Sequence, residues 1–355
     1  MGPVTRRTKR TLAAYSETGS VSLQVVALFA RAHEATRRGR NAAAEGHLRE
    51  ALAAMRAAKL VDVPGCRNDF MARVLADALR LGIEKDYVVS LIRQRNLPPP
   101  RDAPDLETWP WPVRIHTLGR FSALHDGMPL ATGPPGGARP IELLKALIAL
   151  GGRDVDETKL AQQLWPAAEG DRAHRCLKVN VHRLRRLLDE PCVVWGEGRL
   201  SLDSRCVWID VWALERVLGT LEIALRARCF EDIAVLSATA LALNRGEFLR
   251  DDANPWALAT RARLRAKFLR ILGAAAEVLR ASGHTSEALR CYEKALEVDP
   301  IAERFFQGLM RCHLDLGQRS DGLAVYQRCR ETLAREFKLA PSAKTESLHT
   351  ALLSN

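Results

Sequence analysis

The sequence predicts a mainly α-helical protein with a small β component. Three observations support this fold class. Helical spacing of apolar residues runs through 21–97 and again from 207 to the C-terminus. Between these two regions the pattern changes to that of short strands and shorter helices. Near the C-terminus, one helical stretch is echoed 34 residues later, a period that is typical of stacked helix pairs.

Residues 1 to about 20 are predicted to form a loose basic tail ahead of a helical region that ends at residue 97. The expected helices of this region are 22–38, 41–58, 68–81 and 85–93. The apolar run at 21–30 also suits a signal peptide, but polar residues separate it from the basic N-terminus and it has no small-residue cleavage site. We therefore interpret it as an amphipathic helix. The role of residues 1–97 stays open between sensing a ligand, inhibiting the next domain and docking on a partner.

Residues 96–112 read NLPPPRDAPDLETWPWP and carry six prolines, so they suit neither a helix nor an ordinary strand. We interpret 98–112 as a stiff linker and the first domain boundary.

The central region, 113–206, is predicted to contain short strands, three helices and a hairpin. The expected elements are two or three strands within 113–130, a Pro/Gly loop at 131–140, helices at 141–150, 157–165 and 172–189, and a hairpin at 192–203. Asp171 is available to cap the third helix, and Pro191 follows its end.

The third helix has one apolar face and one basic face. At 100° per residue a stripe of aliphatic side chains lies opposite a nearly continuous basic surface. The apolar stripe is formed by Leu177, Val181, Leu184 and Leu188. Such a helix is either an ordinary packed helix with a solvated basic face or a helix that offers this face to the major groove of DNA.

The order of strands, three helices and hairpin is that of a winged helix-turn-helix domain. In this fold the third helix enters the major groove, and the hairpin wing reaches the backbone or the minor groove. The residues expected to contact bases are Arg175, Lys178, Val179 and His182. The residues expected to contact phosphates are Arg172, Arg183, Arg185, Arg186 and Arg199. For each of them, the alternative is an exposed side chain without a nucleic-acid role.

Residues 207–355 are predicted to be helical throughout. GHTSEALRCYEKALEVDP is echoed by GQRSDGLAVYQRCRETLA, so that Tyr292 corresponds to Tyr326, as in tetratricopeptide (TPR) helix pairs. The flanking helices 254–282 and 342–353 are expected to cap this short array. We interpret the arginine-rich run RARLRAKFLR at 261–270 as a solvated helix face rather than a second nucleic-acid site.

Several motifs together resemble a known family. LGRF at 118–121, LWP at 164–166, the basic helix and WIDVWALE resemble OmpR-type winged helices. They are more similar still to the Streptomyces antibiotic regulatory protein (SARP) family, in which a helical bacterial transcriptional activator domain built from TPR-like pairs follows the winged helix. The resemblance implies a transcriptional activator that dimerises on direct repeats and contacts RNA polymerase. The helices before residue 98 resemble the end of the helical arrays of MalT-type regulators.

The formal net charge of +11 supports a polyanionic partner without establishing one. The eight cysteines occur singly, without paired zinc-ligand spacing, and indicate reduced thiols in a cytoplasmic protein. We expect no metal, no cofactor and no membrane span. Trp165, Trp195, Trp208 and Trp212 are interpreted as packing residues rather than base-stacking ones.

The sequence contains no phosphate-binding loop and no recognisable catalytic constellation, so we do not expect an enzyme. If related regulators carry an ATPase module, this chain either works without nucleotide or is a truncated form. The predicted function is sequence-specific binding of double-stranded DNA in transcription regulation, with a small molecule or a protein as a conceivable effector. The alternative is a TPR scaffold whose winged helix mediates protein contacts.

Overall fold

The computed structural model describes residues 20–100, 106–130, 138–168 and 170–354. The chain forms two compact units, each described here by itself. The first comprises the described residues up to Val113 together with Ser204–Trp208. The second comprises Arg114–Asp203 and the described residues from Ile209 onward. None of the helices in the described ranges is both long and apolar enough to cross a membrane.

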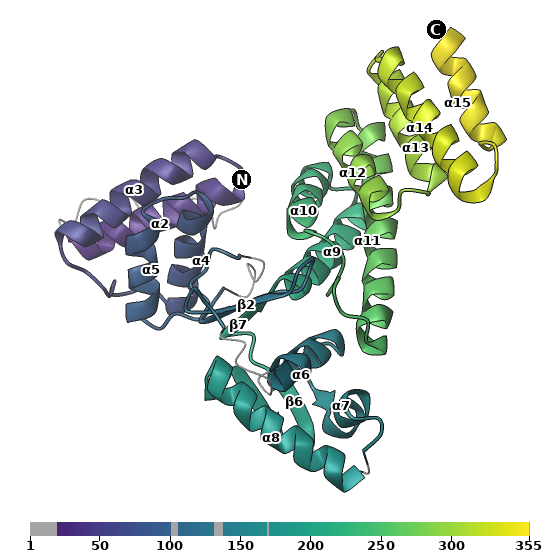
Figure 1. Cartoon of the computed structure of the whole chain (residues 1–355). Coiled ribbons are helices and arrows are strands. Elements are labelled where there is room, and N and C mark those ends of the chain that lie inside the picture. The colour runs from purple at the N-terminus through teal and green to yellow at the C-terminus, as the bar shows by residue number, and fades with distance from the viewer. Residues whose placement is uncertain (1–19, 101–105, 131–137, 169, 355) are drawn as a thin grey trace. The chain divides into compact units, whose positions relative to one another are not determined.

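The first unit is a bundle of helices (Figure 1). Its elements are α2 (Val21–Arg37), α3 (Asn41–Ala57), α4 (Asn68–Arg80) and α5 (Lys85–Gln94). Helix α2 packs against α3 and α4, and its side chains Val25 and Phe29 are fully buried. The apolar run at 21–30 is therefore part of a packed amphipathic helix, and all four predicted helices are confirmed.

The C-terminal end of the predicted linker is packed. The Trp111 indole donates a hydrogen bond to the Leu106 carbonyl at 2.9 Å, and both side chains are buried together with Trp109. Three large apolar side chains explain this order despite the prolines, because their burial is favourable. Residues 101–105 of the linker lie outside the described ranges.

Two small sheets frame the winged helix. The first has the strand order β3-β2-β1-β7 and contains β1 (Val113–His116), β2 (Ser122–His125), β3 (Met128–Pro129) and β7 (Val207–Ile209). The second has the order β4-β6-β5 and contains β4 (Val155–Asp156), β5 (Val193–Gly196) and β6 (Arg199–Leu202). Strands β5 and β6 form the predicted hairpin in antiparallel register, with Val193 opposite Leu202 and Gly196 opposite Arg199.

Three helices complete the winged helix: α6 (Ala138–Ala149), α7 (Glu157–Leu164) and α8 (Gly170–Leu188). Each of the three packs against the other two. The Asp156 carboxylate caps α7 by accepting a hydrogen bond from the Lys159 backbone N–H at 2.9 Å. A short 3-10 turn, η1 (Glu190–Cys192), then leads from α8 into the hairpin.

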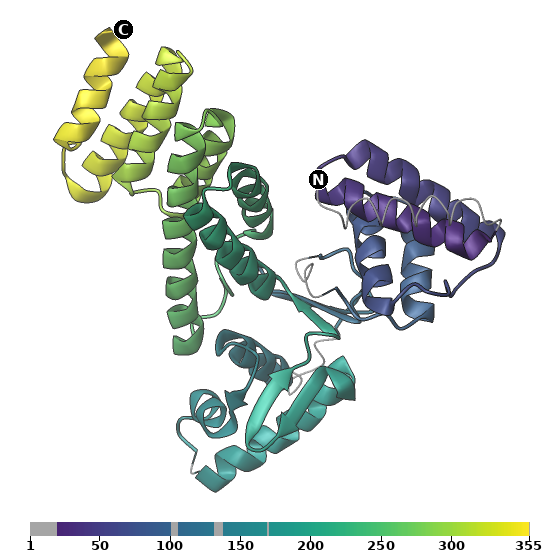
Figure 2. The same ribbon diagram turned by 180° about the vertical axis from the view of Figure 1, so that it is seen from behind.

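The rest of the second unit is an array of antiparallel helices (Figures 1 and 2). Its elements are α9 (Asp210–Ala227), α10 (Phe230–Leu243), α11 (Pro255–Ala281), α12 (Thr285–Val298), α13 (Glu303–Asp315), α14 (Arg319–Phe337) and α15 (Ala343–Ser354). The predicted repeat is visible at the side-chain level. Tyr292 and the corresponding Tyr326 are both buried. Their acceptors differ in place: Tyr292 donates to Glu277 of the preceding α11, and Tyr326 donates to Glu346 of the following α15, both at 2.9 Å.

Three local predictions were wrong. Helix α8 begins at Gly170, so Asp171 lies in its first turn, where a carboxylate favours the helix dipole, rather than at the N-cap. The residues between the expected helices 141–150 and 157–165, for which no strand was predicted, contain strand β4, which pairs with β6. Residues 207–209 form strand β7 instead of the start of a helix, because all three side chains, among them Val207 and Ile209, are buried in extended backbone.

Candidate nucleic-acid interface

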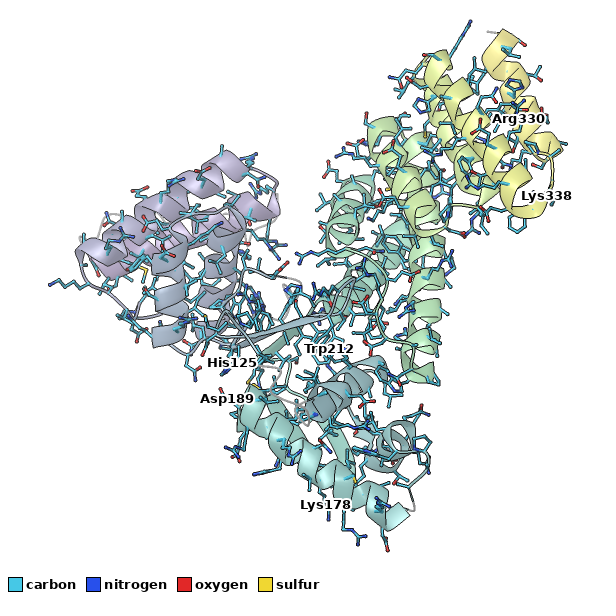
Figure 3. All side chains as sticks on the ribbon, in the orientation of Figure 1. His125, Lys178, Asp189, Trp212, Arg330 and Lys338 are labelled. Atoms are coloured by element: carbon cyan, nitrogen blue, oxygen red, sulfur yellow. The ribbon has the colours of Figure 1, made fainter. Side chains whose placement is uncertain are left out.

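Helix α8 is held by one face and exposes the other. Leu177, Leu184 and Leu188 are fully buried, and Val181 is nearly so, so the predicted apolar stripe is the packed face. All four residues predicted to contact bases are exposed. Val179 retains half of its surface, although it is aliphatic. Lys178 projects outward from α8 (Figure 3). The sequence thus identified which side of α8 faces solvent.

The exposed cations of α8 have no anionic partners within the part of the chain that the structure describes. Five basic side chains share this property: Arg172, Arg175, Lys178, Arg183 and Arg186. Asp171 is the one acidic residue of the helix. A surface of uncompensated cations of this kind attracts a polyanion and releases its counterions on binding.

Helix α11 provides a contrast within the same unit. Its arginine-rich run was expected to be a solvated face, and Arg263 and Arg270 are indeed exposed, but each has an acidic partner. Arg263 pairs with Glu215 at 2.6 Å, and Arg270 pairs with Glu222 at 3.1 Å. Arg261 donates to the carbonyls of Phe248 and Asp252 at 2.8 and 2.9 Å. Arg263 and Arg270 are therefore surface cations whose charges are compensated by carboxylates of α9, whereas Arg261 has internal partners.

Two of the predicted phosphate contacts have internal partners. The Arg185 Nε donates to the Val193 carbonyl at 3.1 Å, so this half-buried side chain ties α8 to the hairpin. Arg199 lies exposed on β6 and donates to the Asp154 carbonyl at 3.0 Å, which orients its guanidinium at the edge of the wing. Arg185 is therefore a structural residue as well as a candidate contact.

Glu157 connects three parts of the winged helix, a role that the sequence did not reveal. Its Oε2 accepts a hydrogen bond from the Trp195 indole of β5 at 2.8 Å, and its backbone N–H donates to Gly198 at the turn of the wing. Its other carboxylate oxygen lies 3.8 Å from His174 Nδ1 on the first turns of α8. Glu157 thus fixes the wing relative to α7 and the start of α8.

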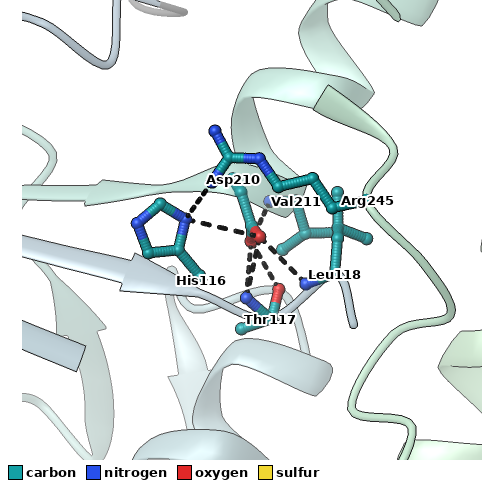
Figure 4. A network of polar contacts seen from close by, with 6 residues as sticks. All are labelled: His116, Thr117, Leu118, Asp210, Val211 and Arg245. Carbon is teal, nitrogen blue, oxygen red and sulfur yellow. Dashed lines mark hydrogen bonds and ion pairs between the residues drawn. The ribbon is translucent and has the colours of Figure 1, made fainter. Parts of the chain in front are cut away.

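Asp210 connects the winged helix to the C-terminal helices (Figure 4). This buried carboxylate, at the first position of α9, accepts hydrogen bonds from the Thr117 N–H, the Thr117 hydroxyl and the Leu118 N–H. Burial raises the pKa of Asp210 above its ordinary value, while these hydrogen bonds act in the opposite direction. A single carboxylate at the start of α9 therefore satisfies the hydrogen-bond donors that follow β1.

Further contacts hold the winged helix against the C-terminal helices. The Gly119 N–H donates to the Glu247 carbonyl at 2.8 Å, and the Leu249 N–H donates to the Thr117 carbonyl at 2.7 Å. Trp212 packs over Gly152 and donates its indole N–H to the Gly151 carbonyl at 3.1 Å. Together with buried Trp208, Trp212 has the packing role predicted for it.

None of the eight cysteines, all of which lie in the described ranges, forms a disulfide, and five of them are buried. No group of three His, Cys, Asp or Glu side chains within the described ranges is arranged to hold a metal ion.

Comparison with known proteins identifies the C-terminal helices. Residues 209–353 match the family model of the bacterial transcriptional activator domain. The chain is 28% identical over 244 residues to the regulatory protein AfsR of Streptomyces coelicolor, which covers 68% of this chain and 24% of AfsR. It is 26% identical over 271 residues to the transcriptional regulator RedD of the same organism, covering 72% of this chain and 74% of RedD. It therefore spans about a quarter of the length of AfsR.

Among solved structures, the fold is similar to that of Mycobacterium tuberculosis EmbR in complex with a low-affinity phosphopeptide. The TM-score is 0.52 at 23% identity, with 68% of this chain and 65% of the EmbR chain covered. The resemblance to SARP-type regulators and the mainly α-helical fold with small sheets are thereby confirmed. The comparisons leave the individual site residues as predictions.

Proposed function

We propose that this protein is a transcriptional regulator that binds double-stranded DNA sequence-specifically, with α8 in the major groove and the β5–β6 wing on the backbone or in the minor groove. The observation that carries the proposal is the contrast between α8 and α11. The two helices of one unit have five arginines each, but cations of α11 are paired with carboxylates and the exposed ones of α8 are not. A helix that is fixed by buried leucines and exposes uncompensated cations is suited to enter a groove lined by phosphates.

Within this interface we assign base contacts to Arg175, Lys178, Val179 and His182, which share the exposed face of α8. Arginine and lysine can donate to guanine O6 and N7, and an exposed valine can contact a thymine methyl group. Arg172, Arg183, Arg186 and Arg199 are assigned to phosphates. Arg185 has a second, structural role, since it also holds β5.

The similarity to SARP-type regulators extends the proposal to activation of transcription, binding as a dimer and contact with RNA polymerase. We assign the polymerase contact to the activator domain at 209–353. Its TPR-like helix pairs present an extended surface of the kind that binds protein segments. Cysteines without disulfides among the described residues agree with the cytoplasmic location that we propose.

The test is selection of bound sequences from a random pool of DNA duplexes. Wild type is compared with the Arg175→Ala/Lys178→Ala variant and with a matched control, Arg263→Ala/Arg270→Ala, which removes the same number of cations from α11. We expect a motif that wild type and the control enrich and that the α8 variant loses or relaxes. If about six phosphates are neutralised, the log–log salt slope of the affinity is near −5.

The scaffold alternative predicts a different result. It requires that neither wild type nor the control enriches a motif and that DNA affinity lacks the steep dependence on salt. Equal loss of the motif in the α8 and α11 variants would also overturn the assignment to α8, because it would show an effect of net charge alone.

A further inference from the structure

A pocket of about 230 Å³ lies in the second unit, where α9, α11 and α12 meet the loop 244–248. Leu118, at the end of β1, also lines it, so both the winged helix and the activator domain contribute. Protein interiors are normally filled to crystal-like density, and a space beside core side chains carries a cost in stability. Pockets at junctions between domains are preferred sites for small ligands.

The floor of the pocket is apolar. Leu264 and Phe268 from α11 and Phe248 from the loop line it, and each is almost completely buried in the core. An apolar ligand body would cover the small area that these side chains leave exposed at the pocket, and it gains free energy only from that area.

Cationic side chains outnumber carboxylates in the lining of the pocket, which also includes Glu247 and Glu297. Arg265 of α11 and Lys294 of α12 line it together, with Arg265 paired to Asp299 at 3.1 Å and Lys294 to Glu297 at 2.7 Å. Exposed ion pairs of this kind contribute little to stability, so a ligand anion can take the place of either partner. Arg261 is committed to backbone carbonyls and has a structural role here.

We propose that this pocket is an effector site for a small organic carboxylate with an apolar body. The carboxylate lies between Arg265 and Lys294, and the body lies against Leu264 and Phe268. An uncharged ligand would leave the two cations with their present partners, and a cationic ligand would be repelled by them. The site therefore selects for an anionic head joined to an apolar body.

The loop that lines this pocket also holds the winged helix. Glu247 and Phe248 line the pocket, while the Glu247 carbonyl accepts a hydrogen bond from Gly119 and Leu118 is bridged to Phe248. Gly246, at φ +156°, lies so close to Gly119 that a Cβ on it would be 3.1 Å from the Gly119 Cα. A ligand that contacts this loop therefore changes the stability of the junction. Its effect on DNA affinity rests on the proposed function, whereas its binding does not.

The experiment uses the full chain and two probes, 3-phenylpropionate and its neutral analogue 3-phenylpropionamide, in isothermal titration calorimetry without DNA. We expect the acid to bind saturably and the amide to bind about tenfold more weakly or not at all. Lys294→Met and Arg265→Met keep apolar side chains and should each weaken the acid about fivefold. Lys344→Met, at an exposed position on α15, is the matched control and should change nothing.

A second kind of variant tests the space rather than the charge. Val298→Phe adds bulk at a half-buried lining position and should abolish binding of the acid, while the melting temperature shows that the chain still folds. Equal affinity for acid and amide, unchanged binding by Lys294→Met, or no saturable binding at about 10 mM acid would each overturn the proposal.

The regulatory part is measured separately as DNA affinity with and without the acid. An unchanged DNA affinity at saturating acid would show that the pocket does not regulate DNA binding, while the binding site for the acid would still stand. Absence of any specific DNA binding would reject the proposed function without affecting the calorimetric result.

Discussion

Asp210 and Thr117 lie 93 residues apart in the sequence, and the carboxylate of the first accepts hydrogen bonds from both the backbone N–H and the hydroxyl of the second, at 2.8 and 2.7 Å. Both residues are buried, as a pair that joins the strand before the winged helix to the first helix after it. This contact makes the winged helix and the activator domain parts of one compact unit.

Asp210→Asn should lower the free energy of unfolding by about 3 kcal/mol, because the amide loses acceptor capacity and places its own N–H₂ group among buried donors. Urea denaturation measures the change. Asp251→Asn, at an exposed position in the second unit, is the control and should stay within about 0.5 kcal/mol of wild type. A similar result for both variants would contradict the structural role of Asp210.

Two helical glycines should respond to alanine in opposite directions. A Cβ on Gly308 would lie 2.5 Å from the ring of Tyr292, whereas a Cβ on Gly219 meets nothing within 4 Å. Gly219→Ala should therefore stabilise the protein by about 0.5–1 kcal/mol through helix propensity. Gly308→Ala should destabilise it by about 1–3 kcal/mol through overpacking. Melting curves decide the signs, and a stabilising Gly308→Ala would show that the repeat does not pack in this way.

Arg183 and Arg185 are close in sequence but should affect different measurements. Arg183 has no partner in the described ranges, so Arg183→Ala should reduce the magnitude of the salt slope of DNA binding by about 1 and leave stability unchanged. Arg185→Ala removes the hydrogen bond to Val193 and should cost about 1 kcal/mol of stability. The prediction fails if both variants alter the same quantity to the same extent.

Glu157 should matter for DNA affinity through the position of the wing. Glu157→Ala removes the acceptor of the Trp195 indole, and we expect DNA binding about tenfold weaker together with a shift in the Trp195 fluorescence. Glu157→Gln retains an acceptor oxygen and should restore most of the affinity. Failure of glutamine to restore it would assign the effect to charge rather than to wing position.

The free energy of unfolding should fall at alkaline pH. Burial raises the pKa values of Cys291, Cys312 and Cys329 from 9.0 to about 12. Between these values the unfolded chain releases protons that the folded chain retains, so their contribution is complete below pH 9 and is lost as the pH rises toward 12. Urea unfolding at a series of pH values should show this decline. Cys312→Ala should make it less steep, and an unchanged slope would contradict the prediction.

The structure confirms most of the helices, strands and buried faces that were predicted from the spacing of residues along the sequence. The spacing of Leu177, Val181, Leu184 and Leu188 predicted the buried face of α8, and the echo of Tyr292 at Tyr326 predicted that both tyrosines pack in the core. Such patterns are readable because a helix returns to the same face every few residues, whatever it packs against. One exception was β7, where a short apolar stretch does not distinguish a strand from the start of a helix.

What the sequence by itself determined is therefore the helical fold class, the winged-helix order and the exposed face of α8. The compensation of charge was decided by tertiary structure. Helices α8 and α11 each contain five arginines, but Glu215 and Glu222, each 48 residues before its partner, neutralise Arg263 and Arg270 of α11. The contact of Asp210 with Thr117 and the wing contacts of Glu157 were likewise decided by tertiary structure. Periodicity reports which face of a helix is buried, whereas the partner of a polar side chain depends on which distant segment the fold places within hydrogen-bond distance.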